Sequence, residues 1–451
     1  MERTREVFAF WVQDDWAPTS RLTLNLGVRY DLDLGVLGED VAFAPFLSGN
    51  RPHDINNIAP RLGFALQLNE RTVVRGGYGL FYTQLESDAA HQSELWSRTT
   101  IPQILNDGRA DFAVNPFNGP KPTYDQILAN SCDKTNNRAG CFRRSVTIEI
   151  PGPSEKGIDT LHEVGFSHQG SIGVQRQIGT VSAIEVNYVF TGGRHEEVAR
   201  NMNLSYNAAT LANNPFSNRA LLPFPEWGTV LGEFMVGRTN YHGMEMNFTK
   251  RMSSRWQANA TYSLSGFSDS PGEPVFVQPD GRGGVMWSPL AFRVVPDLGD
   301  DYSFAVTDQR HRATFNGIWD VAYGVQLSGL YFFGSGQRFA TNWGGDLRNL
   351  GTTANQGNWG AGRLRPDGAI VPRNDLVGDP IHRVDMRIQK RFRLGGRMTA
   401  DGMAEVFNIF NHANYGSYTT AVSNVRYGQP SFNANVAYQP RIVQLGFRFA
   451  F

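Results

Sequence analysis

Residues 21–32, RLTLNLGVRYDL, alternate strictly between two kinds of side chain. The apolar positions are Leu22, Leu24, Leu26, Val28, Tyr30 and Leu32. The polar or small positions are Arg21, Thr23, Asn25, Gly27, Arg29 and Asp31. A period of two predicts a β-strand with one apolar and one polar face. This strand alone fits both a soluble sandwich, whose apolar face is the core, and a membrane barrel, whose apolar face meets lipid.

The same alternation recurs along the whole chain. It predicts thirteen strands, at residues 5–16, 20–34, 59–69, 72–82, 165–178, 181–192, 240–251, 255–267, 311–321, 325–336, 382–394, 397–410 and 439–451. Most of these segments exceed the ~5–6 residues of an ordinary globular strand. They reach the ~9–11 residues that a tilted membrane-spanning strand needs.

The connections between these segments alternate in length. Short turns are predicted at residues 17–20, 69–71, 179–180, 253–254, 322–324 and 395–396. Long loops are predicted at 35–58, 83–164, 193–239, 268–310, 337–381 and 411–438. A sandwich has no reason for this regular order, whereas an outer-membrane barrel has short periplasmic turns and long extracellular loops. The sequence therefore predicts an all-β, antiparallel, transmembrane outer-membrane β-barrel fold.

Composition agrees with a barrel wall. The 451 residues include 42 Lys+Arg and 42 Asp+Glu, so the formal net charge is zero, and nucleic acid is not expected as a partner. Aromatic residues make up 12% of the chain and charged residues only 19%, which argues against disorder. Because the chain lacks an apolar run of ~18 residues, a helical membrane protein is excluded.

Aromatic residues gather near the predicted strand ends, as in an interfacial girdle; they are Trp16, Tyr30, Tyr82, Trp256 and Trp319. For Trp256 and Trp319 an ordinary core position is the alternative. The final segment, RIVQLGFRFAF, has an apolar face made of Val443, Leu445, Phe447, Phe449 and Phe451. Its alternatives are an edge strand on a soluble core and the last strand of a membrane barrel.

Four blocks of sequence resemble the C-terminal barrel half of TonB-dependent receptors, with the Oar-like subgroup closest. They are FWVQDDWAPTSRLTLNLGVRYD, NIAPRLGFALQLNERTVVRGGYGLFY, DQRHRATFNGIWD and RFRLGGRMTADGMAEVFNIFNHANYG. The resemblance implies a receptor in the outer membrane of a Gram-negative bacterium, which imports a scarce ligand with energy relayed by TonB. It also implies a 22-stranded barrel with a plugged lumen. The last strand resembles the signal that the barrel-assembly machinery recognises by strand addition.

The chain also departs from that family. We find no signal peptide at MERTREVFAF, and no plug domain or TonB-contacting box. The first and last predicted strands run in the same direction, so thirteen strands cannot close with antiparallel pairing alone. We therefore expect residues 1–451 to be one partial barrel domain, from a gene fragment, a split gene or a misplaced start. Contact with TonB is expected to require a plug segment outside these residues.

The two cysteines, Cys132 and Cys141, lie in the longest predicted loop, within SCDKTNNRAGC. In an oxidising compartment this spacing favours a small disulfide loop, with two free thiols as the alternative. No CxxC motif or second cysteine pair accompanies them, so a metal site is not expected. Histidines are scattered without metal-ligand spacing, and His311 in DQRHR is predicted to pair structurally at the rim.

No nucleophile elbow, phosphate loop or dinucleotide fingerprint is present, so neither an enzyme nor a cofactor is predicted. In FNIFNHANYG, the asparagines Asn408, Asn411 and Asn414 are expected to hydrogen-bond their own turn at the rim. Ligand contacts are expected from the outer loops. Each tryptophan of these loops is expected either to stack on a ligand or to pack against neighbouring loops. These residues are Trp96, Trp227, Trp287, Trp343 and Trp359.

Three functions remain open at this stage. The first is a receptor barrel that takes up an unknown small ligand such as an oligosaccharide, peptide or metal chelate. The second is a complete, smaller passive channel of the porin kind, in which the first and last strands would be hydrogen-bonded. The third is a soluble all-β carbohydrate-binding protein, which would need no outer-membrane lipid around it. The pairing of the edge strands separates the first two.

Overall fold

A computed structural model gives the fold of the chain. It describes residues 5–35, 38–47, 49–83, 94–95, 101–104, 108–133, 140–150, 164–203, 205, 214, 218–270, 275–277, 283–285, 302–344, 365–367, 369, 371–432 and 439–451. Within these residues the regular secondary structure is almost entirely β. None of the helices found there is long and apolar enough to cross a membrane.

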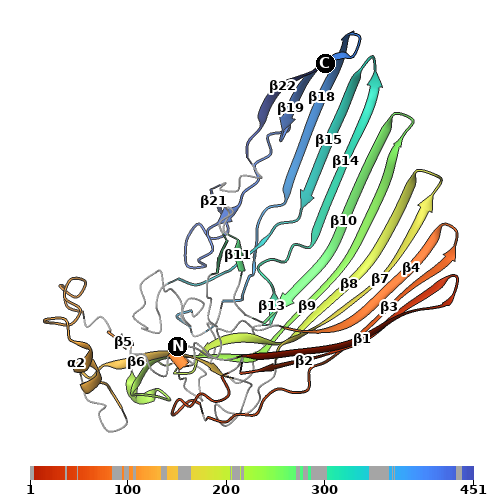
Figure 1. Cartoon of the computed structure of the whole chain (residues 1–451). Helices are drawn as coiled ribbons and strands as arrows, with labels where there is room; N and C mark the ends of the chain where they lie inside the picture. Colours follow the sequence, from red (N-terminus) through yellow and green to blue (C-terminus); the bar gives the residue numbers. More distant parts are fainter. Residues whose placement is uncertain are drawn as a thin grey trace.

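Thirteen antiparallel strands form one curved sheet, and spatial neighbours follow one another in chain order (Figure 1). We call this sheet the wall. Its strands are β1 (Glu6–Thr19), β2 (Leu22–Leu34), β3 (Ile58–Asn69), β4 (Thr72–Tyr82), β7 (Phe166–Ile178), β8 (Ser182–Asn201), β9 (Trp227–Ser253), β10 (Trp256–Asp269), β14 (His311–Ala322), β15 (Val325–Gly334), β18 (Ile381–Gly395), β19 (Met398–Phe407) and β22 (Ile442–Ala450). Each predicted strand is present, so the predicted fold class is confirmed.

Two strands extend far beyond their predicted bounds. β8 continues to Asn201 and β9 begins at Trp227, so both extend into the predicted loop 193–239. The register between them shifts at Arg194/Glu196 and again at Glu196/Glu197. A β-bulge interrupts the regular alternation of faces, which is why the period-two pattern ends before the strands do.

Tight turns join the strands at one end of the sheet (Figure 1). Ser254 and Arg255 both have positive φ, of 49° and 70°, and Tyr323 and Gly324 have φ of 51° and 76°. Two consecutive positive φ values are the signature of a type I′ turn, whose twist matches that of a hairpin. A Cβ at Gly324 would lie 2.7 Å from the carbonyl oxygen of Arg391, so this position also needs glycine for space.

The two faces of the wall differ in chemistry. Ala260 on β10 opposes Phe248 on β9 and Phe315 on β14. One residue further along, Thr261 opposes Asn247 and Thr314 on the same two strands. Apolar side chains therefore line up with apolar ones and polar with polar from strand to strand. This register produces one continuous apolar face and one continuous polar face.

The sheet is open at both edges. β1 pairs with β2 alone, and β22 pairs with β19 alone, within the residues that the structure describes. In Figure 1 these two strands lie at opposite edges of the curved sheet. β1 and β22 are therefore not hydrogen-bonded to each other as they would be in a closed thirteen-stranded ring.

The long connections gather at the other end of the sheet and carry short elements of their own. These are β5 (Ile101–Gln103), α2 (Tyr124–Ala129), β6 (Arg143–Ile150), η1 (Arg219–Leu221), β11 (Val275–Val277), β12 (Gly283–Val285), β13 (Ser303–Phe304), β16 (Arg338–Phe339), β17 (Leu376–Val377), β20 (Ser417–Tyr418) and β21 (Pro430–Phe432). β6 pairs in parallel with the extended part of β9. The largest fully buried side chains, Phe46, Val230, Asn203 and Asn414, all lie at this end.

Candidate functional site

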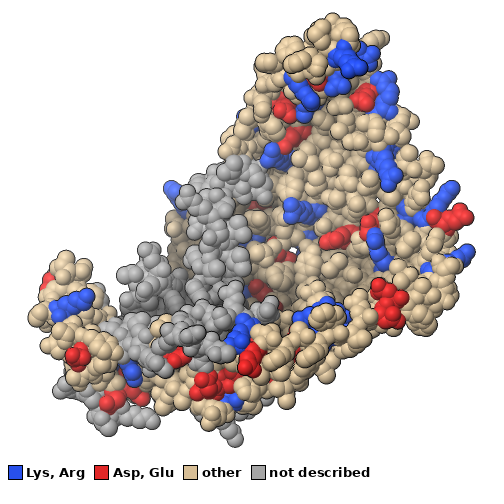
Figure 2. Space-filling model, viewed as in Figure 1, with Lys and Arg blue, Asp and Glu red and all other residues tan. Residues whose placement is uncertain are grey.

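Several charged side chains on the polar face of the wall pair with one another. Arg75 on β4 reaches past β7 to Glu185 on β8, with Nη2 and Oε1 2.7 Å apart. On β18, Arg383 pairs with Asp385 at 2.8 Å and Arg391 with Asp401 of β19 at 2.7 Å. Figure 2 shows the two signs of charge interspersed rather than gathered in one patch.

Glycines on β3 and β4 hollow out part of this polar face. A concavity of about 370 Å³ is lined by Asn25, Arg61, Gly63, Gly77, Gly79 and Phe81, among others. Phe81 folds over Gly79, where a Cβ would lie only 2.7 Å from the phenyl ring, and the Arg61 guanidinium lies 4.7 Å from the centre of that ring. A second concavity of about 490 Å³ lies nearer the tight turns and includes Arg71, Glu185 and Arg251. Both present polar groups and bare backbone on the polar face of the wall.

Comparison with known proteins gives this architecture a family. A family model described as an outer membrane beta barrel domain matches residues 1–444. The chain belongs to this family. It is 22% identical over 420 residues to the TonB-dependent transporter Oar of Myxococcus xanthus, covering 89% of this chain and 35% of that protein. The resemblance to Oar-like TonB-dependent receptors is therefore confirmed.

Solved structures agree on the fold. The outer membrane transporter YddB of Escherichia coli superposes with a TM-score of 0.50 at 12% identity, over 98% of this chain and 45% of that one. A mutant of the ferric enterobactin receptor PfeA of Pseudomonas aeruginosa gives a TM-score of 0.50 at 11% identity, over 99% and 45%. This chain thus spans about a third of the length of the curated relative and less than half of each solved chain.

Membership of this outer-membrane barrel family orients the wall. The protein belongs in the outer membrane of a Gram-negative bacterium, with the tight turns in the periplasm and the long loops outside. The apolar face meets lipid and the polar face lines the lumen. Trp16, Trp256 and Trp319 are 53%, 41% and 52% exposed on the apolar face, near the tight turns. Exposure to this extent fits the girdle and not a core position for Trp256 and Trp319.

The outer loops pack around an aromatic cluster. Phe43, Phe46 and Leu47, from the loop after β2, meet Trp227 and Val230 at the start of β9. The rings of Phe46 and Trp227 lie edge to face with centroids 5.0 Å apart, a favourable arrangement for aromatic pairs. Asn203 closes the cluster by accepting a hydrogen bond from the Phe224 amide and donating to the Trp227 carbonyl.

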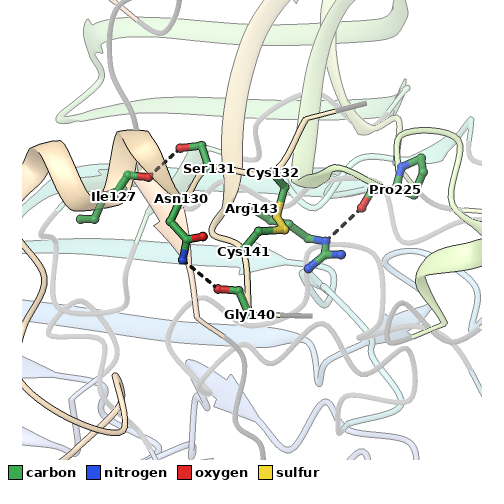
Figure 3. The surroundings of a disulfide bond; sticks show 8 residues. All are labelled: Ile127, Asn130, Ser131, Cys132, Gly140, Cys141, Arg143 and Pro225. Carbon is green, nitrogen blue, oxygen red and sulfur yellow. Dashed lines mark hydrogen bonds between the residues drawn. A yellow bond between two sulfur atoms is a disulfide. The ribbon is translucent and has the colours of Figure 1, made fainter. Parts of the chain in front are cut away.

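Cys132 and Cys141 are joined in a disulfide at the base of the loop that carries α2 (Figure 3). Nearby, the Ser131 hydroxyl donates to the Ile127 carbonyl at 2.9 Å. Arg143, two residues after the disulfide, donates from Nε to the Pro225 carbonyl at 2.9 Å. The next residue, Arg144, lies 4.4 Å from the centre of the Trp227 ring. These contacts connect the disulfide loop to the aromatic cluster.

Burial shapes the charge of this outer region. Desolvation lowers the pKa of both Arg143 and Arg144. Desolvation, assisted by the positive charge of Arg143, lowers the pKa of Arg219 to about 10. All three guanidinium groups remain positively charged at neutral pH. The base of the disulfide loop is therefore a locally cationic region of the outer face.

The five loop tryptophans have different outcomes. Trp227 is 5% exposed and belongs to the aromatic cluster. It therefore packs against neighbouring loop residues, the second of the two roles predicted for it. Trp343 is half-buried and lies 5.4 Å from the Arg365 guanidinium, measured to the ring centre. Trp96, Trp287 and Trp359 lie outside the described residues. The structure therefore brings none of the described members into a shared pocket.

Strand β22 presents the predicted assembly face openly. Val443, Leu445, Phe447 and Phe449 are between 61% and 79% exposed, and Phe451 is fully exposed. Near the preceding rim, Asn408 donates from Nδ2 to the His412 carbonyl at 2.9 Å, within its own turn as predicted. Asn414 also bonds within its turn, donating to the His412 carbonyl at 3.4 Å, and it accepts from the His382 amide of β18, so it fastens the turn to the wall.

Sequence analysis missed four tyrosine–histidine pairs on the lipid face. Each joins the two strands that flank a long loop, with the tyrosine hydroxyl hydrogen-bonded to histidine Nδ1 at 2.7–3.1 Å. The pairs are Tyr78–His168, Tyr188–His242, Tyr262–His311 and Tyr331–His382, and we call them the Tyr–His belt. Position was the available signal, because each histidine follows closely after a long loop. A search for metal-ligand spacing overlooks that regularity.

No group of three or more His, Cys, Asp or Glu residues suited to holding a metal ion occurs in the part of the chain that the structure describes. Three groups of described residues are suited to binding a ligand or lipid. They are the paired charges and concavities of the lumen face, the cationic base of the disulfide loop, and the Tyr–His belt.

Proposed function

We propose that this chain forms part of the wall of a TonB-dependent receptor that imports a scarce ligand across the outer membrane. The observation that carries the proposal is the wall itself, a wide antiparallel arc with a lipid face, a polar lumen face and two open edges. The name of the relative Oar, a TonB-dependent transporter, supports the same activity. Transport, rather than catalysis, is the function that this arrangement supports.

The open edges favour a larger barrel over the passive channel. In a complete small channel, β1 and β22 would pair with each other, whereas each has one neighbour in the described residues. We propose that residues 1–451 act as one partial barrel domain and that further strands close the ring. Coupling to TonB would then pass through a plug segment that is not among these residues.

Assembly is proposed to start at β22. Its exposed phenylalanine face and unpaired edge are suited to strand addition by the barrel-assembly machinery. The disulfide loop and Trp343 are proposed to lie on the ligand's entry path, because outer loops carry ligand contacts in proteins of this architecture. Oligosaccharide, peptide and metal chelate remain equal candidates for the ligand.

Uptake measurements in the native bacterium test the proposal. We would delete the gene that encodes this chain and follow uptake of labelled oligosaccharides, peptides and ferric chelates at limiting concentration. For one class, uptake should be lost on deletion, and in wild-type cells it should also be lost on adding a protonophore or deleting tonB. Uptake that needs the gene but neither TonB nor the proton gradient would instead identify a passive channel.

A further inference from the structure

The Tyr–His belt follows a regular diagonal across the sheet. His168 opposes Gly192 on β8, whereas His242 opposes Phe190 on the same strand, two residues nearer the tight turns. His311 repeats the step on β10, where it opposes Leu264 while His242 opposes Gly266. His382 repeats it once more, because it lies level with Ala313 of β14, two residues beyond His311; both Ala313 and His382 oppose Phe333. Each histidine is thus displaced by two residues for every two strands.

This diagonal matches the tilt of strands in a membrane barrel. A step of one residue per strand, at ~3.3 Å per residue and ~4.8 Å between strands, corresponds to a slope of ~35°. Barrel strands tilt by ~35–45°, so a line with this slope runs parallel to the membrane plane. The tight turns shift in the same direction, because Thr72 opposes Arg176 while β7 continues to Ile178 before turning. The four pairs therefore lie at one depth.

That depth is the outer-leaflet interface. His311 is the first residue of β14, and His382 is the second of β18, at the ends from which the long loops emerge. Tyr78 and Tyr188 are 41% and 44% exposed on the lipid face. In a Gram-negative outer membrane this is the level of the phosphorylated sugars of the outer-leaflet glycolipid.

The hydrogen bonds leave one polar atom of each histidine for another partner. When the tyrosine hydroxyl donates to Nδ1, the ring proton resides on Nε2, which becomes a donor. Across the described residues, none of these four Nε2 atoms has a hydrogen-bond acceptor within the protein. Tyrosine and histidine rings are also nearly parallel in two pairs, with interplanar angles of 26° and 18°. In that tautomer the belt presents oriented N–H donors on an aromatic surface.

Two arginines add positive charge beside the belt. Gly192 opposes His168, and a Cβ there would lie 3.3 Å from Nη1 of Arg194. Gly266 opposes His242, and a Cβ there would lie 3.2 Å from Nη1 of Arg310. In both places a guanidinium fills the space of the missing side chain next to a belt histidine. Guanidinium groups and N–H donors together are the chemistry that recognises phosphate.

We propose that the Tyr–His belt is a binding surface for the phosphorylated headgroup of the outer-leaflet glycolipid. The histidine Nε2 atoms and the guanidinium group of Arg310 bind phosphate oxygens, and the aromatic rings pack against the sugar and the start of the acyl chains. Arg194 donates to the Gly193 and Thr239 carbonyls and to Asn240, so it adds positive charge beside the belt. This role is separate from ligand transport and uses the lipid face alone. Binding at the belt fixes the depth of the barrel in the membrane and holds specific glycolipid molecules against the protein.

Lipid binding by the natural protein, purified from outer membranes in detergent, tests this proposal. The probes are diphosphoryl lipid A and the same lipid with both phosphates removed, and native mass spectrometry counts bound lipid at increasing concentration. The variant H168F/H242F/H311F/H382F should retain diphosphoryl lipid A about tenfold more weakly, because it loses the charge-assisted hydrogen bonds. Arg310→Gln should weaken diphosphoryl binding and leave dephosphorylated binding unchanged.

A matched control alters the same face at greater depth. I172L/M246L/F315L/M386L changes four exposed lipid-facing residues and should bind like the wild type. Folding is checked by heat-modifiable migration on gels. If the histidine variant does not assemble, Y78F/Y188F/Y262F/Y331F keeps every ring and should still bind about threefold more weakly, because Nε2–H is no longer enforced. Equal retention of both lipids, or no loss in the tyrosine variant, would overturn the proposal.

Discussion

The wall and the outer loops of this protein are built on opposite rules. Large apolar side chains of the wall, such as Phe315 and Ile172, are more than half exposed on the protein's own surface. In the aromatic cluster at the outer end, Phe46 and Val230 are 1% and 0% exposed. The apolar side chains of the wall therefore pack against lipid, whereas those of the outer end pack against one another in a small core like that of a water-soluble protein. Burial within the protein is a poor guide to which apolar residues matter here.

Polar groups show the same reversal. On the wall, the paired charges Arg75 and Glu185 stand on the lumen face with side chains 50% and 25% exposed. In the outer loops, Arg338 and Asp308 pair at 3.0 Å with side chains only 17% and 3% exposed. Wall polarity is determined by the face on which a residue falls, and loop polarity by its individual partners.

The largest effect is expected from placing a charge on the lipid face. Phe315→Arg puts a guanidinium midway between His311 and Trp319 on the apolar face of β14, at a cost of ~2–4 kcal/mol near the bilayer centre. We expect a strong loss of folded, heat-modifiable protein in the outer membrane. Asn316→Arg, the adjacent residue on the lumen face, is the control and should assemble normally. Equal assembly of the two would mean that the assignment of faces is wrong.

A smaller but clear effect is expected at β22. Removing Phe451 takes away the most exposed member of its phenylalanine face. We expect slower assembly and a several-fold lower amount of protein in the outer-membrane fraction, measured by quantitative immunoblotting. Ala450→Ser, on the opposite parity of the same strand end, should have no such effect. An unchanged membrane level after Phe451 removal would count against an assembly signal here.

The smallest effect on the wall is expected from the outer disulfide. C132S/C141S releases a cross-link worth ~2–3 kcal/mol of unfolded-loop restriction. Among the described residues, that loop joins the wall through its base, where β6 pairs with β9. We therefore expect faster cleavage by an external protease within residues 124–143. Heat-modifiable migration of the barrel should stay the same. Loss of barrel folding would show that the two regions are coupled more tightly than their contacts indicate.

The wall could be predicted because one physical rule governs all of it. Lipid on one side and a water-filled lumen on the other impose a period of two on every strand. The segments RLTLNLGVRYDL and RIVQLGFRFAF can therefore be predicted as strands without knowing their tertiary contacts. Short and long connections then orient the strands. The same alternation places Arg383, Arg387 and Arg391 together on the lumen face of β18.

The outer end could not be predicted in the same way, because its contacts are formed between segments far apart in sequence. Trp227, at the start of β9, contacts Phe43 from the loop after β2. The parallel pairing of β6 with β9 produces no alternation of apolar and polar residues that a sequence pattern could reveal. The Tyr–His belt combines residues such as Tyr78 and His168 across 90 positions. Their relation becomes visible only once the register is known.

The regular register described above also limits how such a protein evolves. Inserting one residue in a wall strand would move every following side chain to the wrong face, and each strand between the edges is held on both sides. Length changes are therefore expected to survive only in the connections or at bulges such as the one near Arg194. Relatives of this chain should keep strand lengths nearly constant while their outer loops diverge, so recognition can change without redesigning the membrane anchor.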